Sequence, residues 1–211
     1  MIGGVTPRKL LKTMSQSIGE AGLPSPLVAG ADPFFVLVGT VISLRTRDAV
    51  TEVVTRQVLA AAPSPVELAA IPVEELAELL HPAGFFNRKA IQLKKTAEIL
   101  LRDYNGEIPR NRKALESLPG VGGKTAAYVL SMAFKIPAIC VDVHVHRISN
   151  RMGIIKTASP EESEKALMEY FPEELWIPLN HIFVRFGQRI CLPRNPKCSG
   201  CVFKGWCDYA D

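Results

Sequence analysis

The chain has 211 residues, of which 47% are hydrophobic and 22% charged, and its formal net charge is +4. This composition is typical of a globular protein with one large or two small domains, and it excludes the disordered and fibrous classes. No apolar run of signal-peptide length stands at the start, and no segment approaches the roughly eighteen apolar residues that span a bilayer. We therefore predict a cytoplasmic protein with no membrane partner.

Positive charge gathers in two stretches of the sequence. Residues 175–207 hold five basic residues and no acidic one, and residues 87–113 hold eight basic against three acidic residues. One such run alone is more often a solvated surface. Two runs, in a chain whose acidic residues gather elsewhere, favour a face that binds a polyanion.

Helix-start signals, each an N-cap residue followed by proline, stand at Asp32, Ser64 and Ser159. Apolar residues recur at spacings of three and four in four segments, which in chain order are 47–62, 73–80, 89–104 and 164–171. Only the segment IPAICVDVHV at 136–145 is rich in β-branched residues, and it is short and isolated. We predict an all-α protein of about ten short helices.

The glycine-rich loop LPGVGGKTA at 118–126 runs into a helical pattern. A nucleotide-binding P-loop would need glycine at position 118 and a preceding strand, but Leu118 stands there and a helical pattern precedes it. A helix–hairpin–helix over about 112–134, which holds a DNA backbone phosphate, fits better than a mere glycine-rich turn. The predicted phosphate contacts are Leu118, Gly120, Val121, Gly122, Gly123 and Thr125.

A weaker echo of this loop stands at 81–90, with the sequence HPAGFFNRKA. It also places proline, glycine and then a lysine ahead of alanine on a turn that opens a helix. Taken alone, the echo predicts little.

Four of the five cysteines lie within seventeen residues at the spacing C-x6-C-x2-C-x5-C. In a cytoplasmic chain such a group binds metal more often than it forms disulfides. Zinc sites usually use two paired C-x2-C units, whereas one pair flanked by single cysteines favours a [4Fe–4S] cluster over zinc. The predicted ligands are Cys191, Cys198, Cys201 and Cys207.

The hairpin loop, the segment VDVHVHR at 141–147 and the cysteine spacing follow one another in this order. In these features the chain, from about Asp32 to Cys207, resembles the endonuclease III family of DNA glycosylases in the helix–hairpin–helix superfamily. The resemblance implies a monomer with two domains. They are a six-helix barrel over 27–139 and a discontinuous iron–sulfur domain made of 1–26 and 140–211, with its cluster loop at 191–207.

The resemblance also implies removal of oxidised pyrimidines from duplex DNA, followed by strand cleavage at the abasic site. Cutting the bond to C1′ needs a nucleophile and a negative charge near the sugar, and Lys124 and Asp142 supply them. A lysine amine that expels the base leaves a Schiff base, which permits β-elimination, while a carboxylate steadies the sugar's positive charge. Taken singly, Lys124 would be a surface lysine and Asp142 a helix cap. Their spacing of eighteen residues, with the hairpin, favours catalytic roles.

By the same resemblance, two loops at 43–48 and 83–89 fill the gap that an extruded nucleotide leaves. Arg45 stands where glutamine is common in the family, and Phe85 where an aliphatic residue is usual. Because arginine has donors and no acceptor, Arg45 favours guanine as the opposite base, unless it only holds a phosphate. The basic residues between the cysteines, Arg194, Lys197 and Lys204, are expected to contact DNA phosphates.

Two alternatives stay open. A mismatch or adenine glycosylase of the same fold generally lacks lysine at the hairpin position, so Lys124 argues against it. A non-catalytic DNA-binding module with a redox-sensing cluster would leave Asp142 and the two gap-filling loops without a purpose. In either case double-stranded DNA is the predicted partner, which would place the protein at the nucleoid of a bacterial or archaeal cell.

Overall fold

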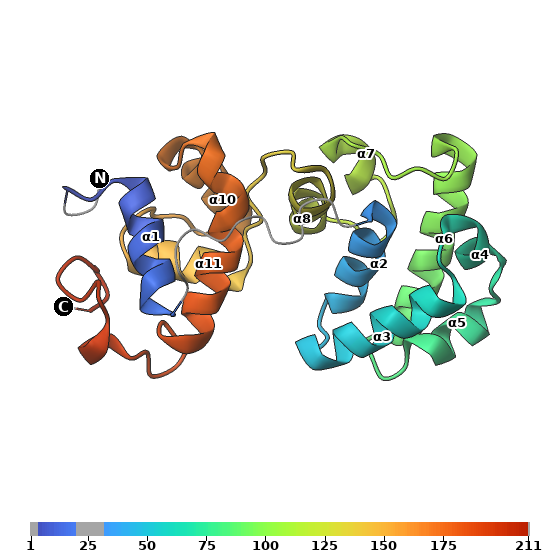
Figure 1. Ribbon diagram of the computed structural model, residues 1–211, viewed down its shortest axis with the longest axis horizontal. Helices are drawn as coiled ribbons and strands as arrows, with labels where there is room; N and C mark the ends of the chain where they lie inside the picture. The colour runs from blue at the N-terminus through green and yellow to red at the C-terminus, as the bar shows by residue number, and fades with distance from the viewer. Residues whose placement is uncertain (1–3, 20–31, 211) are drawn as a thin grey trace. The chain divides into compact units, whose positions relative to one another are not determined.

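The computed structural model describes residues 4–19 and 32–210. These residues form helices and connecting loops with no strand among them, as predicted (Figure 1). They divide into two compact units, one made of 4–19 with 137–210 and the other of 32–136. The predicted domain boundary after residue 139 lies a few residues beyond this division, and the one after residue 26 lies outside the described residues. No helix in the described ranges is long and apolar enough to cross a bilayer.

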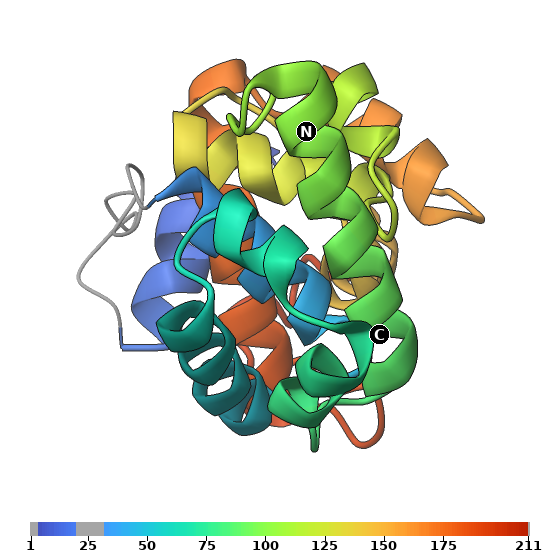
Figure 2. The same cartoon turned by 90° about the vertical axis from the view of Figure 1, so that its right-hand side faces the viewer.

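The unit at 32–136 contains seven helices, and two of them, α4 and α7, are short. They are α2 (Pro33–Ser43), α3 (Asp48–Ala61), α4 (Pro65–Ala70), α5 (Val73–Leu80), α6 (Phe86–Tyr104), α7 (Arg112–Glu116) and α8 (Gly123–Phe134). Figure 2 turns α3 to α6, coloured teal to green, toward the viewer.

Local signals explain where these helices begin. The Asp32 carboxylate accepts from the Phe35 amide at 2.9 Å, and the Ser64 hydroxyl accepts from the Val66 amide at 3.2 Å. Both cap residues precede a proline, which needs no amide partner in the first turn. Inside the unit, α2 packs against α3 and α8, and α6 packs against α4 and α5. Their buried leucines and valines form the core that fixes the loops at the helix ends.

The other unit contains four α-helices and two short 3-10 helices among its described residues. They are α1 (Pro7–Ser17), α9 (Val143–Arg151), α10 (Pro160–Tyr170), η2 (Glu173–Leu175), α11 (Trp176–Arg189) and η3 (Cys198–Gly200). Ser159 caps α10 as predicted, since its hydroxyl accepts from the Glu162 amide at 3.2 Å. Helix α1 packs on α11, so residues near the start of the chain join a unit formed mainly by its last third.

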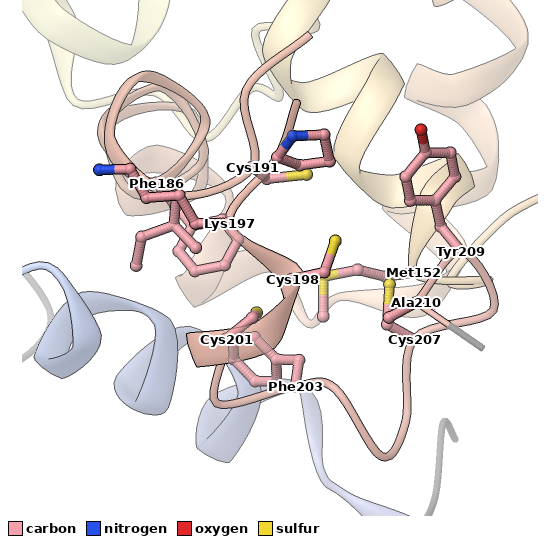
Figure 3. A pocket seen from close by; sticks show the side chains of 12 residues that line it. Met152, Phe186, Cys191, Lys197, Cys198, Cys201, Phe203, Cys207, Tyr209 and Ala210 are labelled. Carbon is pink, nitrogen blue, oxygen red and sulfur yellow. The ribbon is translucent and has the colours of Figure 1, made fainter. Parts of the chain in front are cut away.

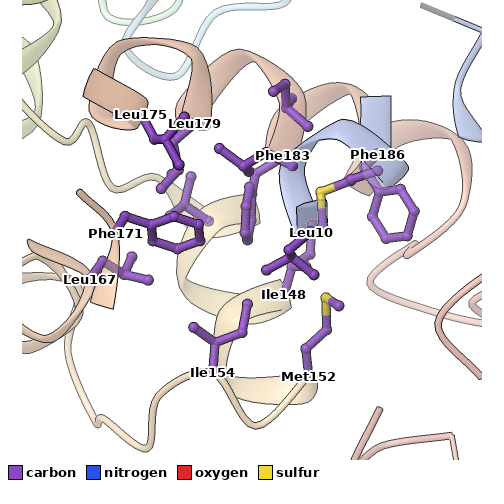
Figure 4. Packing of buried hydrophobic residues seen from close by; sticks show 14 of the residues in the cluster. Leu10, Ile148, Met152, Ile154, Leu167, Phe171, Leu175, Leu179, Phe183 and Phe186 are labelled. Atoms are coloured by element: carbon purple, nitrogen blue, oxygen red, sulfur yellow. The ribbon is translucent and has the colours of Figure 1, made fainter. Parts of the chain in front are cut away.

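The core of this unit gathers apolar side chains from all four α-helices (Figure 4). Leu10 of α1 and Ile148 of α9 lie with Phe183 of α11, and each is almost fully buried. Burying one such side chain contributes about 1.5–3 kcal/mol. The same core continues to Phe203 and thereby supports the cysteine loop that follows α11.

Candidate functional site

The predicted hairpin lies between α7 and α8. Gly120 has a φ of +82°, in the left-handed region that favours glycine. A Cβ on Gly123 would lie 2.8 Å from Nη2 of Arg112, the movable end of a long side chain on α7. The requirement for glycine in this turn therefore lies in the left-handed conformation of Gly120.

Two of the predicted phosphate contacts do not suit that role. Leu118 is 2% exposed and Val121 is 6% exposed. Their amides are also engaged, because Leu118 donates to the Leu115 carbonyl and Val121 donates to the Leu118 carbonyl, both at 3.1 Å. These residues hold the turn together and offer no donor to DNA. The side chain of Thr125 is also buried, which leaves only its backbone for such a contact.

The start of α8 is suited to an anion. Gly122 is its N-cap and is exposed, and no side chain caps the helix. Nothing lies within 4 Å of the point where a Cβ on Gly122 would stand. Helix starts carry a partial positive charge and amides directed along the axis, which favour a phosphate oxygen. Lys124, the second residue of α8, is exposed beside this cap.

Asp142 is the N-cap of α9, as the simpler interpretation of its position predicts. Its Oδ1 accepts from the amides of His144 and Val145 at 2.9 Å, and its Oδ2 lies 3.1 Å from Nδ1 of His144. The side chain is only 10% exposed. The cap does not exclude a catalytic role, because it fixes the direction of a charged carboxylate. Asp142 and Lys124 belong to different units.

His144 is a partner of Asp142 that the sequence analysis missed. Its ring lies against α11, where a Cβ on Gly187 would come within 2.7 Å of the His144 Cδ2 atom. The segment VDVHVHR places His144 two residues after the aspartate, which was the available signal. The 3.1 Å approach of Nδ1 to the Asp142 carboxylate shows that the ring turns back toward it, and this contact is visible only in the structure.

The four predicted cysteine ligands line one pocket on the loop after α11 (Figure 3). The pocket is partly open to solvent, and its lining includes the apolar side chains of Met152, Phe186 and Phe203. Burial raises the pKa of the Cys201 and Cys207 thiols, and the other cysteine sulfurs raise it further. Thiolates at these positions therefore need a compensating cation.

A cluster and a single ion would place different demands on these cysteines. Among the described residues, no three His, Cys, Asp or Glu side chains converge closely enough to hold one metal ion. Zinc would draw four sulfurs to about 2.3 Å from one point, whereas in an iron–sulfur cubane each cysteine binds a different iron. Cys140, the fifth cysteine, is buried and does not line the pocket.

Arg151 of α9 supports this loop at both of its ends. Its guanidinium donates to the Leu192 carbonyl at 2.7 Å and to the Pro193 carbonyl at 2.9 Å, and it lies 3.6 Å from the Cys191 sulfur. The Arg151 carbonyl lies 3.4 Å from the Cys207 sulfur. Between the ligands, the predicted DNA contacts Arg194, Lys197 and Lys204 are exposed.

The structure brings Arg45 and Phe85 together, although forty residues separate them in the sequence. The Arg45 guanidinium carbon lies 5.4 Å from the centre of the Phe85 ring, within the range of a cation–π contact. Both side chains are exposed, and Phe85 is 59% exposed. The two predicted gap-filling loops thus form one surface feature.

Comparison of the sequence with known proteins shows the family to which this chain belongs. Residues 38–173 match the family model described as HhH-GPD superfamily base excision DNA repair protein, and residues 191–207 match the iron–sulfur binding domain of endonuclease III. Over 178 residues the chain is 46% identical to the endonuclease III of Thermotoga maritima, a match that covers 84% of each protein. The chain belongs to the endonuclease III family.

Other members of the endonuclease III family agree with this assignment. The chloroplastic endonuclease III homolog 2 of Arabidopsis thaliana is 41% identical over 186 residues, which cover 84% of this chain and 48% of the plant protein. The chain thus spans about half the length of that relative. A solved structure of a trapped endonuclease III–DNA covalent intermediate superposes with a TM-score of 0.87 at 36% identity, over 95% of this chain and 93% of that one.

Membership of the endonuclease III family confirms the predicted fold class, enzyme class and cofactor. The chain has the helix–hairpin–helix glycosylase fold and is a base-excision-repair DNA glycosylase and lyase that acts on damaged DNA. Its cofactor is a [4Fe–4S] cluster. The four cysteines that line the pocket would hold the cluster, which would supply a structural link across the loop at 191–207.

Protein purified without air is expected to be brown. Each chain should contain about four iron atoms and about four sulfide ions. Metal analysis with a labile-sulfide assay measures both. Cys198→Ser should lower the cluster content, whereas Cys140→Ser should leave it unchanged, because Cys140 does not line the pocket. Stoichiometric zinc in anaerobically handled protein would contradict the assignment.

Proposed function

We propose that this endonuclease III family member removes oxidised pyrimidines from duplex DNA with Lys124 as nucleophile and Asp142 as the charge that steadies the sugar. One observation carries the proposal. An exposed lysine stands in the first turn of α8, beside a glycine cap suited to a backbone phosphate. A phosphate held at that cap would bring the sugar of its nucleotide to the lysine amine.

In this mechanism the damaged nucleotide first turns out of the duplex, at a cost of about a few kcal/mol. A bond then forms between the Lys124 Nζ and C1′ as the bond from C1′ to the base breaks, and the base leaves with a proton. The Asp142 carboxylate opposes the positive charge that grows on the sugar. It then takes a proton from the attached amine and passes it to O4′, as the C1′–O4′ bond breaks and the imine forms between C1′ and Nζ. Loss of the C2′ proton then expels the 3′ phosphate and cuts the strand.

The remaining DNA contacts divide into phosphate contacts and gap-filling residues. The backbone from Gly122 to Thr125 and the exposed side chains of Arg194, Lys197 and Lys204 would hold phosphates without reading sequence. Arg45 and Phe85 would enter the gap as one unit. Since guanine offers two acceptors on its major-groove edge and adenine only one, the Arg45 guanidinium would favour guanine as the orphaned base.

A single chain carries every residue that this mechanism uses, so we propose that the enzyme acts as a monomer. Its substrate would place it with the DNA of the cell, at the nucleoid if the cell is bacterial or archaeal. The presence of Lys124 favours this activity over an adenine or mismatch glycosylase of the same fold, which would direct water to C1′ and leave an intact abasic site.

A panel of duplexes with single defined lesions tests the proposed substrate class. Thymine glycol and other oxidised pyrimidines are expected to be excised and the strand cut, with faster reaction opposite guanine than opposite adenine. Arg45→Gln should lower that guanine-to-adenine ratio, whereas a simple phosphate contact would lower both rates together. Excision of a mispaired adenine or thymine, with oxidised pyrimidines left intact, would contradict the proposal.

A further inference from the structure

The two gap-filling loops adopt an unusual backbone. Arg45 has a φ of 54° and Phe85 a φ of 57°, both in the left-handed region that residues with a Cβ rarely adopt. Phe85 occupies the N-cap position of α6 without forming a side-chain cap. Such conformations persist only where the surroundings enforce them. Something beneath the surface must therefore hold these loops.

The support comes from Lys89, which the sequence analysis did not single out. It lies one turn into α6, and the residue is 3% exposed. Its Nζ donates to the Ile42 carbonyl at 2.6 Å, to the Leu44 carbonyl at 2.8 Å and to the Thr46 hydroxyl at 2.8 Å. An ammonium has three donors, and these three acceptors use all of them. Two of the acceptors are carbonyls at the C-terminus of α2, where a positive charge is favourable.

A second link joins the same loops through their backbones. The Gly84 amide donates to the Thr46 hydroxyl at 3.1 Å, so that hydroxyl accepts from both Gly84 and Lys89. A Cβ on Gly84 would overlap the Arg45 carbonyl oxygen, which shows how closely the loops approach. Arg45 and Phe85 flank this junction and meet above it. Burial lowers the pKa of Lys89 to about 8, so near pH 7 the amine is mainly protonated and retains its three donors.

We propose that Lys89 is a positioning residue that joins the two gap-filling loops at 43–48 and 83–89, so that Arg45 and Phe85 enter the DNA gap as one rigid wedge. The inference rests on the proposed function, because it assigns both residues to the gap. Lys89 itself is buried and touches no DNA. Its effect is on how far the wedge unstacks the duplex, and hence on how well the damaged nucleotide is held outside it.

Helix α6 offers a matched control in Lys94. Its Nζ donates to the Ala69 carbonyl at 2.6 Å and to the Ile71 carbonyl at 2.8 Å, at the end of α4. Lys94 thus stabilises a helix end from the same helix and with the same chemistry as Lys89, but its acceptors lie outside the two loops. Lys94→Met and Lys89→Met remove comparable hydrogen bonds, and only Lys89→Met would disturb the wedge.

The test uses a duplex in which 2-aminopurine stands opposite a stable abasic analogue, so that the signal requires no excision. Saturating wild-type protein is expected to raise the fluorescence as the wedge unstacks the orphaned base. For Lys89→Met and Thr46→Val, we expect the rise at saturation to fall about twofold or more, toward that of Phe85→Ala. A merely structural defect would weaken binding but leave the fluorescence rise at saturation unchanged. For Lys94→Met we expect this unchanged rise at saturation. Adding Lys89→Met to Phe85→Ala should lower the signal no further.

Wild-type amplitude in both Lys89→Met and Thr46→Val would overturn the inference, and so would a wild-type protein that binds without any rise. If Lys89→Met does not fold, Thr46→Val decides, because it keeps the shape and removes the shared acceptor. Borohydride trapping on an ordinary abasic site reports separately on Lys124. Failure of the lysine mechanism would therefore appear in trapping, and failure of the wedge inference in the fluorescence.

Discussion

Lys124→Gln is expected to abolish covalent trapping on DNA by borohydride and to lower strand cleavage on the order of 10⁴-fold or more, since it removes the nucleophile. An amide can neither attack C1′, on which base loss depends, nor form the imine on which β-elimination depends. Binding to a stable abasic analogue should weaken only slightly, because the glycine cap of α8 remains. Gel assays of incision, trapping and binding measure these effects on one duplex.

Lys135→Gln is the matched control for this prediction. It makes the same substitution on an exposed lysine at the other end of α8, and so removes the same charge from the same helix. It should keep wild-type trapping. If Lys124→Gln were trapped at the wild-type yield, another residue would have to be the nucleophile.

Asp142→Asn is expected to slow base excision by about 10²- to 10³-fold, the usual size for loss of one electrostatic group at a reacting centre. Asparagine caps helices as well as aspartate does, so its side-chain oxygen keeps the hydrogen bonds from His144 and Val145 and the fold persists. Cleavage at a preformed abasic site should fall less, because no base has to leave. Single-turnover rates on a lesion and on an abasic site separate the two steps.

Asp32→Asn provides the control, since Asp32 caps α2 in the same way through the Phe35 amide. Its excision rate should stay at the wild-type value. Losses of equal size in both steps for Asp142→Asn would argue that Asp142 supports only the structure of α9.

The helices could be predicted from the sequence because their signals are local. Ser159 and Asp32 cap the helices that begin after them, and the periodic segment at 73–80 is helix α5. The packing of α1 on α11 was only implied by the family resemblance, because it depends on partners far apart in the chain.

In the candidate site, too, the features set by local sequence could be predicted, and those set by contacts between distant segments could not. The cysteine spacing indicated a shared site because all four predicted ligands lie on one short loop, where they line one pocket. Leu118 and Val121 were assigned to DNA because the motif does not show which amides the turn consumes. Lys89 was noticed only as part of an echo of the hairpin loop. Burial of a lysine depends on three acceptors in another segment, and no local pattern encodes them.

Peptide mapping of the trapped complex tests the lysine mechanism most directly. After borohydride reduction on abasic DNA and tryptic digestion, a modified Lys124 resists cleavage, so the adduct should lie on the peptide that spans residues 114–135. Unreacted protein should yield the two shorter peptides 114–124 and 125–135. Fragmentation that places the reduced sugar on Lys124 is the result we predict. An adduct on any other amine of the chain would contradict the assignment of the nucleophile.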